Sequence, residues 1–314
     1  MLALRAEPAE PALELQGKIP MPNVHGRMDH LAADFYNGRL FVAARGNNSV
    51  ESIDVRTNTV RGSIQEVLEP QGVAYVHAAE RIFVTNSGDG SVRIFDGATL
   101  EPLNSVHVGS DPDNIRVDEA HNRVLVGYGD GGLAVLDFTG KLLAGIALKG
   151  HPESFQLAVH SARMFINVPA AHSIVVVDSQ SLKVIGEWPV RDGLENFPMA
   201  LDEEKRRVFV ACRRPARLLV LDMDSGAVVA RLATVGDADD LFYDPIHARV
   251  YVIGGLGKVG VYAQQTADRY SEIDSVGTVA GARTGLFVAE WNRLFVAVRE
   301  FAGHAAEIRI YQPR

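Results

Sequence analysis

The stretch Arg81-Ile-Phe-Val-Thr-Asn-Ser-Gly-Asp-Gly-Ser-Val-Arg-Ile-Phe-Asp96 decides how the rest of the chain is interpreted. Two runs of β-forming residues, Ile-Phe-Val-Thr and Val-Arg-Ile-Phe, flank a Gly-rich turn at Ser87-Gly-Asp-Gly90. An isolated two-stranded hairpin is marginal in water because it cannot bury an apolar face on its own. We therefore expect this hairpin to be one unit of a larger, repeated assembly.

The arginine that opens this stretch recurs along nearly the whole chain. The seven copies are Arg39, Arg81, Arg123, Arg163, Arg207, Arg249 and Arg293, with spacings of 42, 42, 40, 44, 42 and 44 residues. An apolar run follows each of them, such as Leu-Phe-Val-Ala after Arg39. A repeat of about 40–45 residues with four strands per unit is typical of a β-propeller blade. The sequence therefore predicts an all-β fold, a seven-bladed β-propeller with four antiparallel strands per blade.

The quoted stretch resembles the repeat of the YVTN-type seven-bladed β-propellers, and the resemblance extends from about Leu13 to Arg314. It implies a fold and not a reaction, because propellers of this general kind include lactonases, lyases, binding proteins and surface-layer proteins. Since relatives of this type are often exported, it also implies a periplasmic or secreted protein, although a cytoplasmic one stays open. Residues 1–8 lack the apolar stretch of a signal peptide.

The two ends of the repeat region predict how the ring closes. Ala306-Glu-Ile-Arg-Ile-Tyr311 is expected as the third strand of a blade, with no outer strand after it. Leu13-Glu-Leu-Gln-Gly-Lys-Ile-Pro20 resembles the outer strands of other blades, so we expect this N-terminal strand to complete the last blade and remove an exposed edge. Residues 13–314 are thus expected as a single propeller domain, and residues 1–12 as an N-terminal extension.

The charge and the hydrophobicity of the sequence disfavour two classes of binding partner, nucleic acids and membranes. The net charge of −8 and the pI of about 5.7 disfavour nucleic acid, because a protein that grips phosphates normally carries a basic face. No run approaches the roughly 20 apolar residues that a membrane span requires. We expect a monomer that binds neither nucleic acid nor membrane.

The loops that enter the innermost strands point toward the central axis, so one residue per blade can converge there. The residues ten before each repeated arginine are Asp29, Gln71, Asp113, Glu153, Phe197, Asp239 and Arg283. The residues nine before it are His30, Gly72, Asn114, Ser154, Pro198, Asp240 and Thr284. These positions are mostly polar and differ from blade to blade, which predicts asymmetric chemistry on a symmetric frame.

Carboxylates crowded at one opening raise each other's pKa unless a cation intervenes. The sequence therefore predicts a divalent cation, Ca²⁺, Mg²⁺ or Mn²⁺, with oxygen ligands from four residues. These expected metal ligands are Asp29, Asp113, Glu153 and Asp239. Two alternatives stay open: solvated turn-forming residues at strand entries, which Pro70, Pro112 and Pro152 support, and hydrogen bonding to a ligand without metal.

A second set of loops on the same face, between the second and third strands, carries arginine at one equivalent position. Because the guanidinium fork suits carboxylate or phosphate, an anionic small molecule is the expected partner. The expected substrate-binding residues are Gln71, Asn114, Arg45, Arg213 and Arg299. The alternative is that exposed arginines on these loops serve solubility.

The first functional hypothesis is a small-molecule site at the mouth of the ring. It could belong to a metal-dependent hydrolase of the lactonase type or to a lyase, in which the cation polarises a carbonyl or activates water. The expected catalytic residues are His30, Asp240 and Arg283, the first two for proton transfer and the last to orient the anion. The alternative is a non-catalytic scaffold that docks a protein partner through aromatic anchors such as Trp188 or Phe301.

Overall fold

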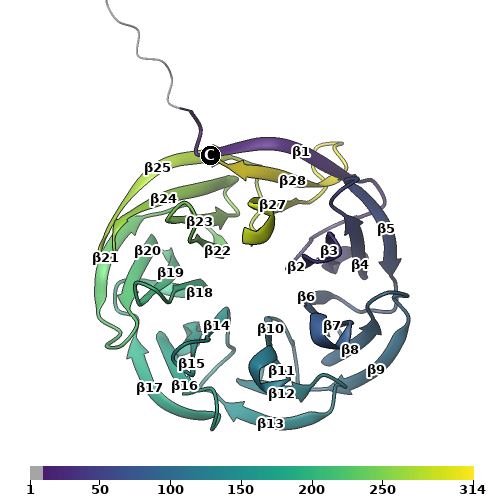
Figure 1. Ribbon diagram of the computed structural model, residues 1–314, viewed down its shortest axis with the longest axis horizontal. Helices are drawn as coiled ribbons and strands as arrows, with labels where there is room; N and C mark the ends of the chain where they lie inside the picture. The colour runs from purple at the N-terminus through teal and green to yellow at the C-terminus, as the bar shows by residue number, and fades with distance from the viewer. Residues whose placement is uncertain (1–9) are drawn as a thin grey trace, which may run out of the picture.

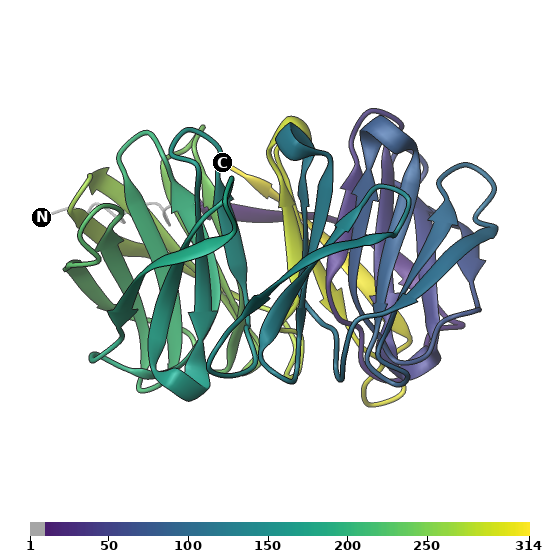
Figure 2. The same ribbon diagram turned by 90° about the horizontal axis from the view of Figure 1, so that it is seen from below.

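The computed structural model describes residues 10–314 and shows seven four-stranded antiparallel sheets, arranged as blades around a ring (Figure 1). The predicted seven-bladed β-propeller is therefore confirmed. Six of the blades are consecutive in sequence, and each begins with its innermost strand. The side view shows the strands running between two faces, with the connecting loops at each (Figure 2).

The blades are numbered in chain order. Blade 1 contains β2 (Leu31–Asp34), β3 (Arg39–Ala44), β4 (Ser49–Asp54) and β5 (Thr59–Ile64); blade 2 contains β6 (Pro70–Val76), β7 (Arg81–Asn86), β8 (Ser91–Asp96) and β9 (Pro102–His107). Blade 3 contains β10 (Ile115–Asp118), β11 (Arg123–Tyr128), β12 (Gly132–Asp137) and β13 (Leu142–Ala147); blade 4 contains β14 (Phe155–Ala158), β15 (Arg163–Val168), β16 (Ser173–Asp178) and β17 (Lys183–Pro189).

The remaining blades follow the same plan. Blade 5 contains β18 (Leu194–Asp202), β19 (Arg207–Arg214), β20 (Ala216–Asp222) and β21 (Val228–Ala233); blade 6 contains β22 (Ala238–Asp244), β23 (Arg249–Gly254), β24 (Lys258–Thr266) and β25 (Arg269–Gly277). Blade 7 contains β26 (Gly285–Val288), β27 (Arg293–Val298), β28 (Ala306–Pro313) and β1 (Leu13–Met21). Short 3₁₀-helices lie at η1 (Arg45–Asn47), η2 (His77–Ala79), η3 (Glu119–His121), η4 (Pro169–Ala171) and η5 (Ala289–Trp291).

The hairpin from which the repeat was recognised is formed by β7 and β8 at the predicted residues. The repeat unit is offset from the blade by one strand, because β10, the fourth strand expected in the second unit, is the innermost strand of blade 3. Strand β9 is also shorter than the expected residues 100–109.

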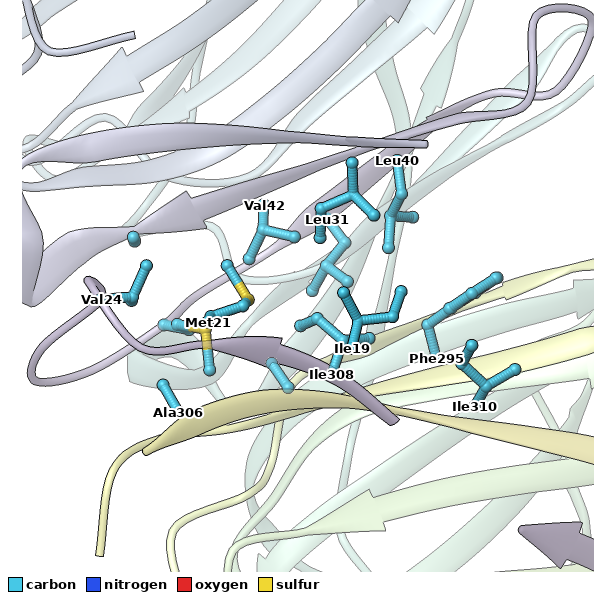
Figure 3. Packing of buried hydrophobic residues seen from close by; sticks show 14 of the residues in the cluster. Ile19, Met21, Val24, Leu31, Leu40, Val42, Phe295, Ala306, Ile308 and Ile310 are labelled. Carbon is cyan, nitrogen blue, oxygen red and sulfur yellow. The ribbon is translucent and has the colours of Figure 1, made fainter. Parts of the chain in front are cut away.

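The ring closes as the sequence predicts. The N-terminal strand β1 pairs antiparallel with β28, with Ile19 opposite Ile308 and Met21 opposite Ala306, and forms the outer strand of blade 7 (Figure 1). Ile19 and Ile308 are fully buried, and they pack with Met21 and Leu40 in one cluster that joins blades 7 and 1 (Figure 3). Residues 1–9 of the expected N-terminal extension lie outside the described residues.

The repeated arginine links neighbouring blades, a role that its regular spacing in the sequence does not by itself reveal. In six blades its guanidinium donates a hydrogen bond to a backbone carbonyl at the turn before the outer strand of the next blade. The donor and acceptor pairs are Arg39 to Gly97, Arg81 to Phe138, Arg123 to Ser179, Arg163 to Met223, Arg207 to Ala267 and Arg249 to Ala12. Each arginine therefore ties its own blade to the following one.

A left-handed backbone conformation precedes every repeated arginine. Gly38, Glu80, Asn122, Ala162, Arg206, Ala248 and Asn292 all have φ between 48° and 68°. This conformation turns the chain tightly from the innermost strand into the second. Glycine and asparagine adopt it readily, whereas Glu80, Ala162, Arg206 and Ala248 hold it at a cost in backbone strain. The turn thus sets the arginine at the same point of each blade.

No helix among the described residues is long and apolar enough to span a membrane.

We expect Arg81→Met to lower the free energy of unfolding by about 1–3 kcal/mol, because it leaves the Phe138 carbonyl without its charged donor but keeps an apolar stem. Arg56, which pairs with Asp54 on the surface, provides the matched control, and Arg56→Met should leave the stability almost unchanged. Urea unfolding of the two variants and the wild type measures both effects. Equal stabilities of the two variants would contradict the role assigned to Arg81.

Candidate functional site

A polar cavity of about 210 Å³ lies where the loops entering the innermost strands converge. We call it the vestibule. It is lined by Arg27, Asp29, His30, Gln71, Asp111, Asp113, Asn114, His151, Glu153, Ser154, Phe197, Arg213, Asp239 and Arg283. These residues come from all seven blades, so the cavity is formed only by the closed ring.

The repeat brings the counted residues together through a repeated backbone contact. The N–H groups of Asp29, Asp113 and Glu153 donate to carbonyls on the second strands of their own blades, those of Ala43, Gly127 and Asn167, at 2.7, 2.9 and 2.9 Å. These three acceptors all lie four residues after the repeated arginine. The carboxyl groups therefore leave the backbone at equivalent points and meet at one level of the axis.

Three guanidinium groups neutralise part of this negative charge. Arg27 Nη2 lies 2.8 Å from Asp29 Oδ2. Asp239 pairs with Arg213 on one side, and its Oδ2 lies 3.1 Å from Arg283 Nε on the other. Burial nevertheless raises the pKa of Asp239, and it raises the pKa of Asp29 to about 7.

His30 lies at the inner end of the vestibule between two carboxylates. Its Nε2 is 3.5 Å from Asp113 Oδ1, and its Nδ1 is 3.5 Å from Asp240 Oδ1. Burial by itself lowers the pKa of His30, but the charge of Asp240 and the contact with Asp113 outweigh burial and hold this pKa well above its usual value. The two carboxylate neighbours therefore favour the protonated form of His30, in which both ring nitrogen atoms are donors.

Glu153 stands apart from the other carboxyl groups. Its side chain lines the vestibule and makes no hydrogen bond or ion pair with any of residues 10–314. Burial, followed by the charges of Asp113 and Asp239, raises the pKa of Glu153 to about 9. By contrast, the pKa of Asp113 is lowered, because the contact with His30 outweighs the effect of burial. The vestibule is therefore short of positive charge at Glu153.

The four expected metal ligands, Asp29, Asp113, Glu153 and Asp239, all line the vestibule, but three of them already have positively charged side chains as neighbours. Among residues 10–314, no group of three or more His, Cys, Asp or Glu side chains is arranged to hold a metal ion. Asp29 and Asp239 are paired with guanidinium groups, and Asp113 Oδ1 lies 3.5 Å from His30 Nε2. A positively charged ion at this point would have to displace or oppose these cations.

The expected substrate-binding residues divide into two groups. Gln71, Asn114 and Arg213 line the vestibule, where Gln71 Nε2 donates to Asp111 Oδ1 at 2.9 Å. Arg45 and Arg299 lie outside it: Arg45 Nη2 is 3.1 Å from Glu69 Oε2, and Arg299 is exposed. The loop position that unites the three arginines in sequence does not fix where their side chains point.

The expected catalytic residues are also separated. His30 and Arg283 line the vestibule, whereas Asp240 lies beyond His30, where its Oδ2 accepts the Gly285 N–H at 2.8 Å. His30 therefore has a carboxylate on each side, but the side chains of His30, Asp240 and Arg283 do not converge on a common point.

Sequence reasoning missed Arg27, His151 and Arg116. Arg27 stands two residues before Asp29, whereas the site was predicted only from the residues nine and ten before each repeated arginine. Arg116 follows the apolar residue Ile115 on β10. At the equivalent position the other blades have Ala32, Ala74, Gln156, Ala200, Phe242 and Leu286, so Arg116 is the one charge in that row and could have been found by extending the count by two residues.

Comparisons with known proteins agree with the fold and add no activity. The chain is 21% identical over 269 residues to the uncharacterized protein YncE of Salmonella typhi and to that of Salmonella typhimurium, with 81% of this chain covered. It spans 64% of the length of those curated relatives. Kuenenia stuttgartiensis hydrazine synthase has a similar fold, with a TM-score of 0.77 at 15% identity over 99% of this chain and 98% of that one. No family model matches the chain.

We expect the stability of the protein to report the protonation of Glu153. A carboxyl group whose pKa rises from 4.5 to about 9 on folding stabilises the protein fully below about pH 4.5, and this contribution is lost as the pH rises towards 9. Glu153→Gln removes the titration and keeps the size of the side chain. The variant should match the wild type near pH 5 and exceed its stability by about 1–3 kcal/mol near pH 9.

Urea unfolding at the two pH values measures this difference. Glu101 is exposed on the turn before β9, so Glu101→Gln is the matched control and should show no such dependence on pH. A Glu153→Gln protein that is less stable than the wild type near pH 9 would contradict a neutral, unpaired Glu153.

Proposed function

We propose that the vestibule binds a small molecule that carries a positively charged nitrogen group, such as an ammonium or a guanidinium. The observation that carries the proposal is the unpaired carboxyl group of Glu153, which is partly buried and lines the cavity. Burying an ionisable group without a partner is unfavourable, so a cationic ligand would supply the charge that the site lacks. Glu153 would then ionise and release its proton.

Other groups in the vestibule support the same class of ligand. Asp113 Oδ1 and Asn114 Oδ1 are buried acceptors without a hydrogen-bond partner among the described residues. They could accept N–H groups of the ligand, and the 3.5 Å separation from His30 Nε2 leaves Asp113 Oδ1 open to a closer donor. The arginines, in contrast, are already paired with Asp29 and Asp239. The cavity of about 210 Å³ is below the usual range for drug-sized ligands, so the ligand is small.

Three further points concern the type of repeat, the metal-dependent enzyme and the protein-docking scaffold. We infer that the seven repeats are of the YVTN type, on the strength of the stretch from Arg81 to Asp96. The metal-dependent hydrolase or lyase is not part of the proposal, because three of its four expected metal ligands, Asp29, Asp113 and Asp239, already contact arginine or histidine side chains. A protein-docking scaffold is not favoured over a ligand site, since the converging charges lie inside a cavity and not on an open surface.

Isothermal titration with n-butylamine and agmatine tests the proposal, with n-butanol and butyrate as the neutral and anionic counterparts. We expect the amines to bind and to release a proton near pH 7.5, which appears as a heat that depends on the ionisation enthalpy of the buffer. Glu153→Gln should weaken amine binding at least about tenfold, or about 1.4 kcal/mol, and abolish proton release. Glu101→Gln should bind as the wild type does.

Two results would overturn the proposal. One is tighter binding of butyrate than of butylamine, which would return the site to the anionic ligand expected from the sequence. The other is amine binding that does not change in Glu153→Gln. A titration with MnCl₂ completes the set, and displacement of the amine by Mn²⁺ would favour the cation site expected from the carboxylates.

A further inference from the structure

A second cavity lies on the other side of His30. Its volume is about 330 Å³, and we call it the inner chamber. His30 lines both the chamber and the vestibule. The other lining residues follow His30 and its counterparts along the innermost strands, so the chamber lies further along the axis, away from the vestibule. His30 and its two carboxylate neighbours therefore divide the axial space.

Arg116 is the guanidinium of the inner chamber, and it is not paired as the vestibule arginines are. Its Nη1 donates to the Ile115 carbonyl at 2.8 Å and its Nη2 to Ser154 Oγ at 3.3 Å. Its Cζ lies 5.5 Å from the centre of the Phe155 ring. Among residues 10–314 no carboxylate oxygen lies within 4.0 Å of its nitrogen atoms. A guanidinium has five N–H donors, so several of them are left for a ligand.

The one carboxylate of the chamber is already engaged. Asp240 Oδ1 lies 3.5 Å from His30 Nδ1, and its Oδ2 accepts the Gly285 N–H at 2.8 Å. Burial lowers the pKa of Arg116, and the charges of Asp240 and Asp113 oppose this effect. Since an arginine stays protonated in proteins, Arg116 adds a positive charge to a space whose one carboxylate, Asp240, already contacts His30 and the Gly285 N–H.

The rest of the chamber is mostly apolar. Phe242 and Phe287 form part of its wall, and so do Leu31 and Val73. The amide of Gln156 provides the other polar group; its Nε2 donates to the Met199 carbonyl at 2.8 Å, and its carbonyl oxygen has no such contact. A ligand that fits this wall therefore has an apolar body and one anionic end.

A wider cavity of about 470 Å³ adjoins the chamber on the side away from His30 and shares Gln156, Phe242 and Phe287 with it. Its lining includes Glu204 and Glu290. These two carboxylates oppose a highly charged anion near the chamber, because each added negative charge increases the repulsion. The chamber therefore favours a single negative charge.

We propose that the inner chamber binds a small monocarboxylate with an apolar body, whose carboxylate pairs with Arg116 and whose body lies against Phe242 and Phe287. The guanidinium fork accommodates a carboxylate in a bidentate pair. This site goes beyond the proposed amine site. Its ligand has the opposite charge, it is bound by Arg116, Phe242 and Phe287 instead of Glu153, and it lies on the other side of His30. The two proposals can therefore fail separately.

Titration of the intact protein with phenylacetate tests the inner chamber. Neutral 2-phenylethanol controls for the apolar body, and inorganic phosphate and succinate control for charge. We expect phenylacetate to bind, and the three other compounds to bind at least about tenfold more weakly or not at all. Arg116→Gln should weaken phenylacetate binding at least about tenfold, which is the loss expected for a charged hydrogen-bonded pair.

Ala32→Phe is the second variant, because it fills the chamber and leaves Arg116 in place. It should also lose phenylacetate binding, and circular dichroism with thermal unfolding checks that both variants are folded. Glu153→Gln separates the two sites, since it changes the vestibule alone.

Equal affinity of the wild type and Arg116→Gln for phenylacetate would overturn the proposal, as would equal binding of 2-phenylethanol. Loss of phenylacetate binding in Glu153→Gln with retention in Arg116→Gln would place the carboxylate in the vestibule and also reject the chamber site. Binding of amines in the same samples decides the vestibule proposal independently.

Discussion

The contact on which the ring depends is the hydrogen bond from the repeated arginine to a backbone carbonyl of the next blade. Blades of a propeller touch mainly their neighbours, so the ring is only as well defined as these interfaces. Arg81, for example, donates to the Phe138 carbonyl at 2.6 Å, and Arg249 makes the same contact with Ala12, just before β1. A charged donor adds direction to apolar packing between blades. Because the contact recurs around the ring, it holds the innermost strands at matched positions around one axis.

On this regular frame, the axis carries charges that are not regular. Asp29 and Asp239 are paired with guanidinium groups, and His30 is shared between Asp113 and Asp240. A charge removed from water without an opposite charge beside it is unfavourable, so two charged side chains without an ion pair among the described residues call for an explanation through ligands. One is Glu153 on the vestibule side of His30, and the other is Arg116 on the chamber side. The two sides of the axis therefore lack charges of opposite sign.

The fold could be predicted from the sequence because its signal is repeated seven times. A single hairpin such as β7–β8 is ambiguous, but seven arginines at a spacing near 42 residues leave little choice of architecture. The same counting located Asp29, Asp113 and Glu153 at the axis, because a backbone hydrogen bond fixes that position in each of these blades. Position in a repeat determines where a backbone lies.

The charge balance of the site could not be predicted in this way, because it depends on where side chains point. Arg45 and Arg213 occupy one repeat position, yet Arg45 pairs with Glu69 outside the cavity while Arg213 pairs with Asp239 inside it. Arg27, which pairs with Asp29, lies in the loop between β1 and β2, twelve residues before Arg39 and so outside the two positions from which the site was predicted. The carboxylates in the sequence therefore suggested a metal ion. The structure instead pairs Asp29 with Arg27, which lies outside the counted positions, and Asp239 with Arg213 and Arg283, which the sequence had assigned to an anionic ligand.

The pairing of β1 with β28 joins segments that are nearly 300 residues apart, the longest-range strand contact in the molecule. Bringing such distant segments together costs loop-closure entropy. This cost arises before the contacts between the two strands can offset it. During synthesis β1 is made long before β28, so the nascent chain passes through an open arc with an unsatisfied strand edge at each end. Neither cavity on the axis exists in that arc, because each needs side chains from both of its ends. Both proposed ligand sites therefore form together, at the moment the ring closes.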